Sequence, residues 1–370
     1  MLRFKGSQQL RQRLVFATLS GRAIRIDDIR VRDAAPGLRD YEASLLRLLE
    51  KCTNGCAVEI NETGTSLRYR PGIIICGGGI VHDCPPSRSI GYFLEPLALI
   101  ALFAKKPLSA TLRGVTNDSL DPSVDVFRTV TLPLLRRAAG LDDGLELRVV
   151  RRGGRPGGGG EVALRVPAVK ALPAVDMREE GMVKRVRGIA YSMKVSPQNA
   201  NRMVDGARGV LNALLSDVYV FTDAASGAAS GLSPGYGAVL VAETTSGALI
   251  SAEACATQGE PESLRPAGDD PLVVPEDVGR AAAQLLLDEV SRGGVVDGGH
   301  QGLLLLLAAL GPEEVSQVRL GPLTPHAVRT LRHVREFFGV MFDLKPDTGS
   351  GTILLTCVGC GLKNLSRKIT

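Results

Sequence analysis

The stretch from Arg151 to Val162 combines residue types that suit phosphate binding, because four consecutive glycines at 157–160 follow three arginines. Glycine has no Cβ, so another group can closely approach the backbone N–H groups of such a run. Arginine carries a planar, permanently charged fork that binds phosphate through two parallel hydrogen bonds. The flanking residues Leu145–Val150 and Val162–Val166 have the composition of strands, which predicts a hairpin turn between them. The two interpretations are compatible.

Three further arginines stand where a predicted strand ends and a loop leads into a helix, namely Arg32, Arg113 and Arg319. A positive side chain at such a position can hold an anion together with the N-terminal end of the helix dipole. The run that begins at Arg113 is the most favourable of the three for phosphate. The alternative is that each arginine packs its stem on the sheet edge and pairs with a nearby carboxylate, such as Asp118 or Asp121.

Two of the four histidines, His326 and His333, lie seven residues apart in one predicted helix and therefore on roughly the same face. Arg332, His333 and Arg335 form a short basic group in that helix. An imidazole with neighbouring cations could activate a ribose 2′-hydroxyl and stabilise a phosphorane, as cleavage of RNA requires. A solvated helix face accounts for the same residues, so both interpretations stay open.

The composition of the 370 residues is that of a globular chain, with 44% hydrophobic and 22% charged residues and a net charge of +5. This mildly basic balance permits nucleic-acid binding without requiring it. Only 4% of the residues are aromatic and tryptophan is absent, which disfavours a base-stacking sheet. The longest apolar run, Leu303–Leu310, is too short to cross a membrane, and Met1–Lys5 lacks the features of a signal peptide. We therefore expect a soluble, intracellular protein.

The seven cysteines do not predict a metal site. Cys357 and Cys360 have the spacing of a zinc or redox pair, but zinc needs four ligands and no second pair stands at a matching spacing. Cys357 follows an apolar run, which favours buried, reduced thiols.

The order of predicted elements repeats three times along the chain. Each unit is of β-α-β-α-β-β type and ends in a closing pair of strands. Residues 183–275 break this order and predict a smaller inserted α/β domain. We therefore predict an α/β (α+β) fold in which residues 1–182 and 276–370 form one large domain of three units. The leading helix of the third unit is expected at Glu276–Arg292 or at Gln301–Leu310.

Several of these segments resemble the RNA 3′-terminal phosphate cyclase family. The family signature is similar to the run formed here by Arg152-Gly153, Pro156, Gly158-Gly159-Gly160 and Val162. Other segments resemble the eukaryotic cyclase-like branch of that family: Leu10–Leu14, Pro36–Asp40, Arg113–Asp118, Asp121–Asp125 and Val195–Gln198. The resemblance covers nearly the whole chain.

The resemblance implies a nucleolar ribosome-assembly factor of the nucleus that lacks cyclase activity. Members of the branch act with a large assembly GTPase in the small-subunit processome, where precursor rRNA is processed towards 18S rRNA. Phosphate or RNA is then expected at Arg11, Arg113, Arg152, Arg155, Gly158, Gly159 and Gly160. The implied partners are the GTPase, processome proteins and precursor rRNA, with no membrane, no metal and no cofactor.

Departures from the cyclases support the absence of cyclase activity, while one residue points the other way. Phe4–Ser7 replaces an acidic, glycine-rich segment, and His300-Gln301 stands where cyclases carry Asp-Gln. His326 occupies the place of the cyclase nucleophile, although Arg329-Thr330 replaces the Thr-Asn pair. Two enzymatic alternatives therefore stay open. One is a cyclase that uses ATP and magnesium through His326, and the other is a precursor-rRNA endonuclease that uses Arg332, His333 and Arg335.

Overall fold

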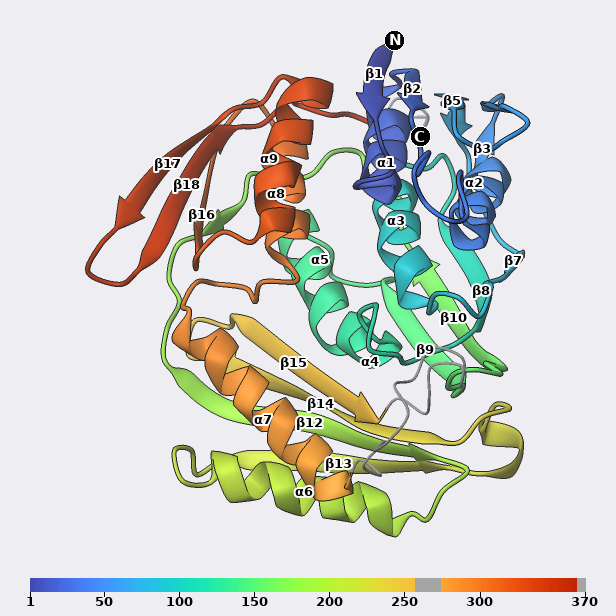
Figure 1. Ribbon diagram of the computed structural model, residues 1–370. Coiled ribbons are helices and arrows are strands. Elements are labelled where there is room, and N and C mark those ends of the chain that lie inside the picture. Colours follow the sequence, from blue (N-terminus) through green and yellow to red (C-terminus); the bar gives the residue numbers. More distant parts are fainter. Residues whose placement is uncertain (257–273, 365–370) are drawn as a thin grey trace.

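Three four-stranded sheets with the same strand order form the larger part of the molecule (Figure 1). The computed structural model describes residues 1–256 and 274–364. The orders are β1-β2-β5-β4, β7-β8-β10-β9 and β11-β16-β18-β17, so each sheet belongs to one unit of the chain. In each sheet the first strand runs parallel to the second, and the other neighbours are antiparallel. This recurrence confirms the predicted three-unit fold.

The elements of the units follow the predicted ranges closely. The first unit contains β1 (Leu2–Lys5), α1 (Leu10–Ser20), β2 (Ile24–Asp27), α2 (Asp40–Cys52), β4 (Ala57–Ile60) and β5 (Leu67–Arg70), with a small extra pair, β3 (Thr53–Asn54) and β6 (Ile73–Ile74). The second contains β7 (Ile80–Asp83), α3 (Gly91–Leu102), β8 (Leu108–Gly114), α4 (Val124–Val126), the π-helical turn η1 (Phe127–Thr131), α5 (Leu132–Ala139), β9 (Glu146–Arg151) and β10 (Gly160–Val166). The third contains β11 (Asp176–Met177), α8 (Gln301–Leu310), β16 (Val315–Leu320), α9 (Pro325–Phe338), β17 (Phe342–Asp347) and β18 (Thr352–Val358).

One predicted strand is shorter than expected. The alternating apolar residues from Ile24 to Val31 predict one continuous strand in the first unit, but β2 ends at Asp27. Asp28 and Arg30 have positive φ angles of 59° and 47°, which a continuous strand cannot contain. The Arg30 guanidinium instead reaches Glu42 in α2, with both Nη–Oε distances at 2.7 Å. The turn therefore connects the sheet to the helix that covers it.

The leading helices α1, α3 and α8 supply much of the core. Every residue of α8 is buried, and every residue of α3 except Glu95 is buried. Figure 1 shows these helices in the middle of the larger domain, with β7–β10 and β16–β18 as walls on opposite sides. The continuous apolar runs of α3 and α8 therefore fill a space between sheets. Among the described residues, no helix combines the length and the apolar character that a membrane span requires.

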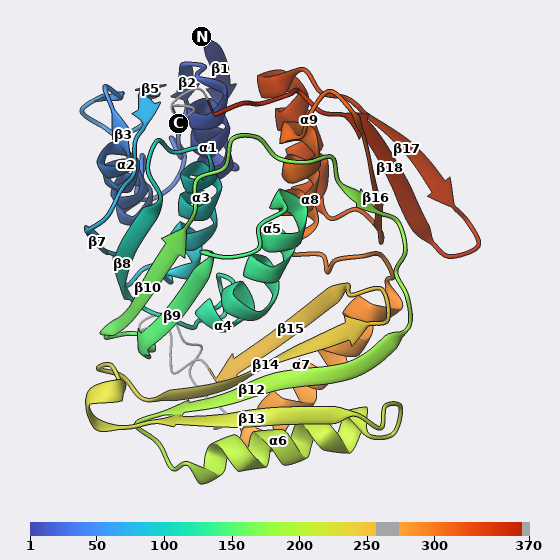
Figure 2. The same cartoon turned by 180° about the vertical axis from the view of Figure 1, so that it is seen from behind.

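The inserted domain is one sheet covered on a single face by two helices. Its elements are β12 (Val183–Met193), α6 (Gln198–Leu211), β13 (Val218–Ala225), the short 3-10 turn η2 (Gly227–Ala229), β14 (Gly235–Thr244), β15 (Leu249–Ala256) and α7 (Pro275–Ser291). The strand order is β13-β12-β14-β15, and Figure 2 shows β15 nearest the larger domain. The chain enters this domain after β11 and leaves it before α8, so the third unit is the one that is interrupted.

Helix α7 corrects the predicted domain boundary at residue 275. We considered α7 as a leading helix of the third unit, but Val278, Ala282 and Leu286 join the core of the inserted domain. The third unit uses α8 instead. Gly206 in α6 and Gly279 in α7 allow the close approach, because a Cβ on either glycine would collide with the backbone of the opposite helix. The inserted domain therefore extends through Ser291.

The helix crossing makes a testable prediction about Gly279. Gly279→Ala should lower the free energy of unfolding by about 1–3 kcal/mol, because the added methyl group would collide with the backbone carbonyl of Met203. Gly209→Ala in α6 is the matched control. No atom lies within 4 Å of its added methyl group, so the better helix propensity of alanine should leave stability equal or slightly higher. Urea denaturation monitored by circular dichroism measures both, and equal stabilities would contradict the close crossing.

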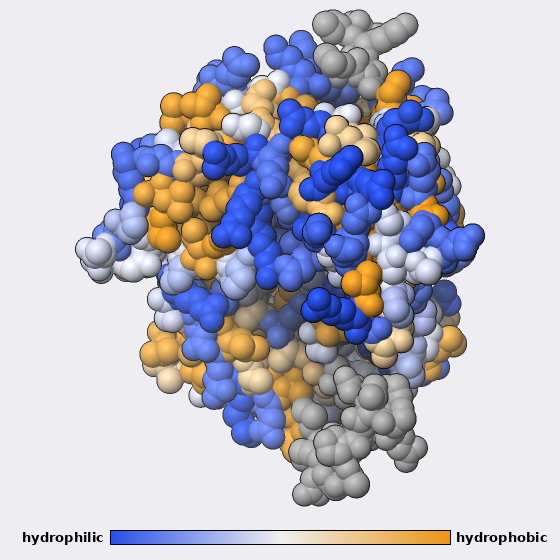
Figure 3. Space-filling view, turned by 45° about the horizontal axis from the view of Figure 1, so that its top comes forward, coloured by the Kyte–Doolittle hydropathy of each residue, from blue (hydrophilic) through white to orange (hydrophobic). Residues whose placement is uncertain are grey.

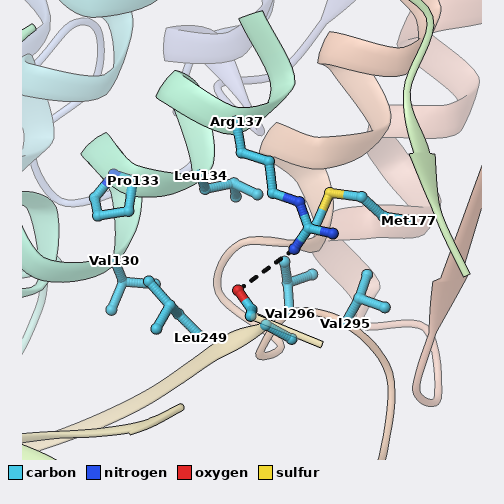
Figure 4. A pocket seen from close by; sticks show the side chains of 10 residues that line it. Val130, Pro133, Leu134, Arg137, Met177, Leu249, Val295 and Val296 are labelled. Atoms are coloured by element: carbon cyan, nitrogen blue, oxygen red, sulfur yellow. Dashed lines mark hydrogen bonds between the residues drawn. The ribbon is translucent and has the colours of Figure 1, made fainter. Parts of the chain in front are cut away.

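A small apolar cavity lies at the interface between the two domains (Figure 4). Its volume is about 40 Å³, and its lining comes from η1 and α5, from the start of β15, and from Val295 and Val296. Arg137 of α5 reaches across and donates to the backbone oxygens of Ser246 and Gly247 at 3.5 and 3.4 Å. Apolar contact and these hydrogen bonds hold the inserted domain against the second and third units.

Candidate functional site

The glycine-rich run is a hairpin turn between β9 and β10. The two strands pair antiparallel, from Glu146 with Arg165 to Arg151 with Glu161, as predicted. Gly158 and Gly159 have φ angles of +65° and +78°, a left-handed conformation that favours glycine. The hairpin interpretation is therefore confirmed.

A loop of the inserted domain covers this turn. The N–H of Gly231 donates to the Arg152 oxygen at 2.5 Å, and the N–H of Leu232 donates to the Gly158 oxygen at 2.9 Å. In return, the N–H of Gly157 donates to the Ser233 hydroxyl at 2.8 Å. The glycines allow another group to approach the backbone closely, and here that group is a loop of the same protein. The run joins the second unit to the inserted domain.

Arg152 is the centre of a buried ionic network behind the turn. Only 3% of its surface is exposed, and it binds Asp125 with two hydrogen bonds of 2.6 and 2.9 Å. Its Nε donates to Asp223 at 2.8 Å, and its guanidinium lies 5.1 Å from the ring centre of Tyr191. Burial alone would lower the pKa of Arg152, but Asp125 and Asp223 more than offset burial and raise it. These contacts give Arg152 a structural role between the two domains.

Arg155 and Arg113 remain partly accessible near the turn. Arg155 donates to Asp118 at 3.1 Å and to the Ser87 oxygen at 2.6 Å, and 30% of its side chain is exposed. Arg113 donates to Glu161 at 2.9 Å, and 49% of its side chain is exposed. The local carboxylate pairing that we weighed for Arg113 is present, although its partner is Glu161. The phosphate role of both arginines stays a prediction.

His326 lies with Arg11 and Glu95 where α1, α3, α8 and α9 converge. Arg11 donates to the Tyr92 oxygen at 3.1 Å, and its other terminal nitrogen is 3.9 Å from a Glu95 oxygen. About a quarter of each side chain in that ion pair is exposed. Gly302 of α8 gives the histidine room, because a Cβ there would lie 2.7 Å from the imidazole Nε2. We call Arg11, Glu95 and His326 the His326 cluster.

The environment of His326 keeps its imidazole neutral at pH 7. Burial lowers the pKa of His326, the charges of Arg11 and Arg329 lower it further, and Glu95 acts in the opposite direction. A neutral imidazole can accept a proton or attack a phosphoryl group. The residue type and the charge state that the cyclase alternative needs are therefore both present.

The cavity beside His326 is small. The cavity that His326 lines with Arg11, Glu95 and apolar residues such as Leu99 and Leu306 has a volume of about 20 Å³. A cavity of that size holds about one water molecule. The cavity itself therefore does not enclose a nucleotide, and among residues 1–256 and 274–364 no group of three or more histidine, cysteine or acidic side chains is suited to a metal ion.

His333 is part of the helix packing between α1 and α9. Its Nε2 accepts from Arg13 at 3.4 Å and its Nδ1 donates to the Gln12 oxygen at 2.8 Å. Gln12 in turn donates to the Thr330 hydroxyl at 2.6 Å, which donates to the His326 backbone oxygen. Burial and the nearby Arg13 lower the pKa of His333 to about 4, so it is neutral at pH 7. The chain of hydrogen bonds fixes the start of α9, where His326 lies.

The predicted basic group of α9 is divided between two faces of the helix. Arg332 and Arg335 are exposed, whereas His333 is 7% exposed and faces α1. The three side chains therefore do not gather on one surface, although they are near neighbours in sequence. His326 and His333 do share a face, as their spacing predicted.

The histidine that replaces the cyclase carboxylate has its own buried partner. His300 Nδ1 lies 2.7 Å from Asp297, and its Nε2 lies 2.8 Å from the Thr131 hydroxyl. Burial opposes a charged imidazole, but Asp297 more than offsets it, so the pKa of His300 is raised. Asp297 also accepts from Ser251 in β15. This ion pair connects the start of α8 to the inserted domain. The Asp297 carboxylate is engaged by both His300 and Ser251.

One group of residues was missed by the sequence analysis. Arg88 forms a bidentate pair with the buried Asp121, and its guanidinium lies 4.7 Å from the ring centre of Tyr92. Arg11 lies 5.0 Å from the same ring, so Tyr92 connects the two arginines. The available signal was the series Asp118, Asp121 and Asp125 after β8, since closely spaced acidic residues beside a core helix need buried cations.

Comparison with known proteins supports the family resemblance over the whole chain. The family described as RNA 3′-terminal phosphate cyclase matches residues 2–344. The human RNA 3′-terminal phosphate cyclase-like protein is 50% identical over 100% of this chain and 98% of its own length. A probable RNA 3′-terminal phosphate cyclase-like protein of Arabidopsis thaliana is also 50% identical, over 100% of this chain and 99% of its own length. The rRNA processing protein rcl1 of Schizosaccharomyces pombe is 46% identical over 99% and 98% of the two chains. The chain therefore belongs to the RNA 3′-terminal phosphate cyclase family.

Proposed function

We propose that this protein is an rRNA processing factor of the cyclase-like branch that works without cyclase chemistry. The observation that carries the proposal is the 46% identity, over nearly the full length of both chains, to a relative named as an rRNA processing protein. The aligned length spans all three units and the inserted domain.

The more specific role follows the resemblance described above. The protein would act in the small-subunit processome of the nucleolus, where it supports early cleavage of precursor rRNA towards 18S rRNA. An assembly GTPase and other processome proteins would be its partners, as the family resemblance implies.

The partly exposed arginines are the residues that we propose for contact with RNA phosphate. Arg11, Arg113 and Arg155 each keep between a quarter and a half of the side chain accessible. Seen with the N-terminal end turned forward, hydrophilic side chains cover the middle of the surface (Figure 3). Arg152 and the three glycines would support this surface from behind rather than bind phosphate themselves.

A complementation experiment tests the proposal and separates it from the cyclase alternative. The chain should restore 18S rRNA production in eukaryotic cells depleted of their cyclase-like protein, and His326→Ala should restore it to within about twofold of the wild type. The physical reason is that His326 is half-buried among α1, α3, α8 and α9 beside a cavity of only about 20 Å³, where we expect it to act in packing. Northern blots of the precursors measure the result, with equal protein levels checked by immunoblot.

Two outcomes would contradict this proposal in different ways. Failure of the well-expressed wild-type chain to restore 18S rRNA would argue against the rRNA-processing role itself. Success of the wild type with complete failure of a folded His326→Ala variant would favour chemistry at His326. In that case, incubation of the purified protein with labelled ATP and magnesium should give an acid-labile adenylate that the variant lacks.

A further inference from the structure

An apolar groove lies on the face of the inserted domain's sheet that α6 and α7 do not cover, beside the place where Val126 and Val130 of the second unit pack against β14. Its volume is about 330 Å³, and Thr129 of η1 forms the wall opposite the sheet. Side chains alternate between the two faces of a strand. Val186 and Leu240 therefore point to the helices α6 and α7, whereas Ile189 and Val241 line the groove. The groove lies outside the His326 cluster and the glycine turn.

The strand β13 borders this groove and is an edge strand. Among the strands of the described residues, its only neighbour is β12, with which it pairs in parallel from Val218 to Ala225. Figure 2 shows β13 on the side of the sheet away from the larger domain. Proteins protect exposed edges with lysine, proline or bulges, and the sequence Val-Tyr-Val-Phe-Thr-Asp-Ala-Ala has neither lysine nor proline. The outer backbone groups of β13 are thus suited to pairing with another strand.

Two exposed aromatic residues lie on the groove side of β13. Tyr219 and Phe221 are 55% and 54% exposed, and their rings pack edge to face with centres 4.6 Å apart. Phe221 also lines the groove, so the aromatic pair and the groove form one continuous apolar surface. Large aromatic side chains at an exposed edge are typical of binding sites rather than of ordinary surface.

The charges around the groove disfavour a nucleic acid as its occupant. Arg187 binds Asp217 with two hydrogen bonds of 2.7 and 3.0 Å, and Arg185 binds Glu243 at 2.7 Å. These two cations are paired with carboxylates, as Arg113 and Arg155 are, but the groove beside them is lined by apolar residues such as Ile189, Phe221 and Val241. Nucleic-acid binding draws most of its affinity from cations that neutralise phosphates. The surface instead favours a partner that contributes apolar side chains and backbone hydrogen bonds.

We propose that this surface binds an extended segment of a partner protein. The segment adds a strand to the outer edge of β13 and inserts an aliphatic side chain beside Phe221 into the groove. Backbone pairing supplies affinity, and the apolar groove selects the side chain, as in other cases of strand addition. This inference does not depend on the proposed role in rRNA processing.

A random dodecapeptide library displayed on phage provides a probe for the test. Selection on the full chain should enrich peptides with aliphatic residues two positions apart. The synthetic peptide should bind at least tenfold more weakly to Phe221→Lys and to Tyr219→Lys, while Met341→Lys should bind as the wild type does. Met341 is a matched control because it is 65% exposed and lies in the third unit. Bound peptide should also slow hydrogen exchange of the amides at 218–225.

Several results would overturn the inference. No enrichment of apolar peptides, or equal binding by all variants, would exclude a peptide site at β13. Binding of a dodecauridylate probe that Phe221→Lys abolishes would assign the surface to RNA. A dimer in sedimentation that the same variant dissociates would assign it to a second copy of this chain. Unchanged thermal unfolding of the lysine variants must accompany each comparison.

Discussion

Replacement of Arg152 by alanine is expected to lower the free energy of unfolding by about 3–5 kcal/mol. The variant leaves Asp125, whose side chain is 0% exposed, without the guanidinium that binds both of its oxygens. Asn117 and Arg128 still contact Asp125 at 3.0 and 3.3 Å, but a carboxylate that loses its two short charged hydrogen bonds at that depth must be protonated or draw water into the core. Urea denaturation followed by tryptophan-independent signals such as circular dichroism measures the loss.

The matched control for Arg152→Ala is Arg113→Ala in β8 of the same sheet. Arg113 also pairs with a carboxylate, but its side chain is about half exposed, so water replaces the lost partner. We expect little change in stability for that variant. Asp125→Asn combined with Arg152→Met should recover much of the loss, since it removes both buried charges. Equal stabilities of Arg152→Ala and Arg113→Ala would contradict the buried network.

The buried pairing of Arg152 changes how the glycine-rich signature around it is interpreted. At the level of sequence, arginines beside four glycines indicate a phosphate site and a hairpin equally well. The hairpin depends on local composition, so it could be predicted. The partners of Arg152 are Asp125 and Asp223, which lie 27 and 71 residues away, and no local pattern identifies them. Burial decides between a phosphate ligand and a structural cation, and burial is a tertiary property.

The fold could be predicted further than the site. Element order alone predicted the three units, because each unit repeats the same succession of helices and closing strands. Element order failed where the apolar pattern does not decide the assignment. The strand β11 has only two residues, and α7 has an apolar face that suits either domain until its contact with α6 through Gly279 is known. The His326 cluster was predicted only in part. Arg11 and His326 were predicted as separate candidates, and Glu95 was not predicted.

Two buried histidines predict a loss of stability in mild acid. His82 accepts or donates to the Ser44 hydroxyl at 2.9 Å, and His333 binds Gln12 and Arg13. Burial lowers the pKa of each to about 4. Between the ordinary histidine pKa and that value, the unfolded chain binds a proton that the folded protein does not. Stability is therefore full above pH 6.5 and falls as the pH decreases towards 4, by about 3 kcal/mol for each histidine.

This loss of stability in acid must be separated from the effect of Glu253, which acts in the opposite direction. Burial raises the pKa of Glu253 to about 7, so the folded protein binds this proton more readily and gains stability as the pH falls from 7. The dependence of wild-type stability on pH contains both effects, whereas single variants separate them. In His82→Gln or His333→Gln, the stability lost between pH 7 and pH 4 should be about 3 kcal/mol smaller than in the wild type. Glu253→Gln should make the same loss larger.

If both histidine variants kept the wild-type pH dependence in urea denaturation, the two imidazoles would carry their protons inside the fold. The hydrogen bond from Arg13 to His333 would then be excluded, because a protonated ring has no acceptor nitrogen.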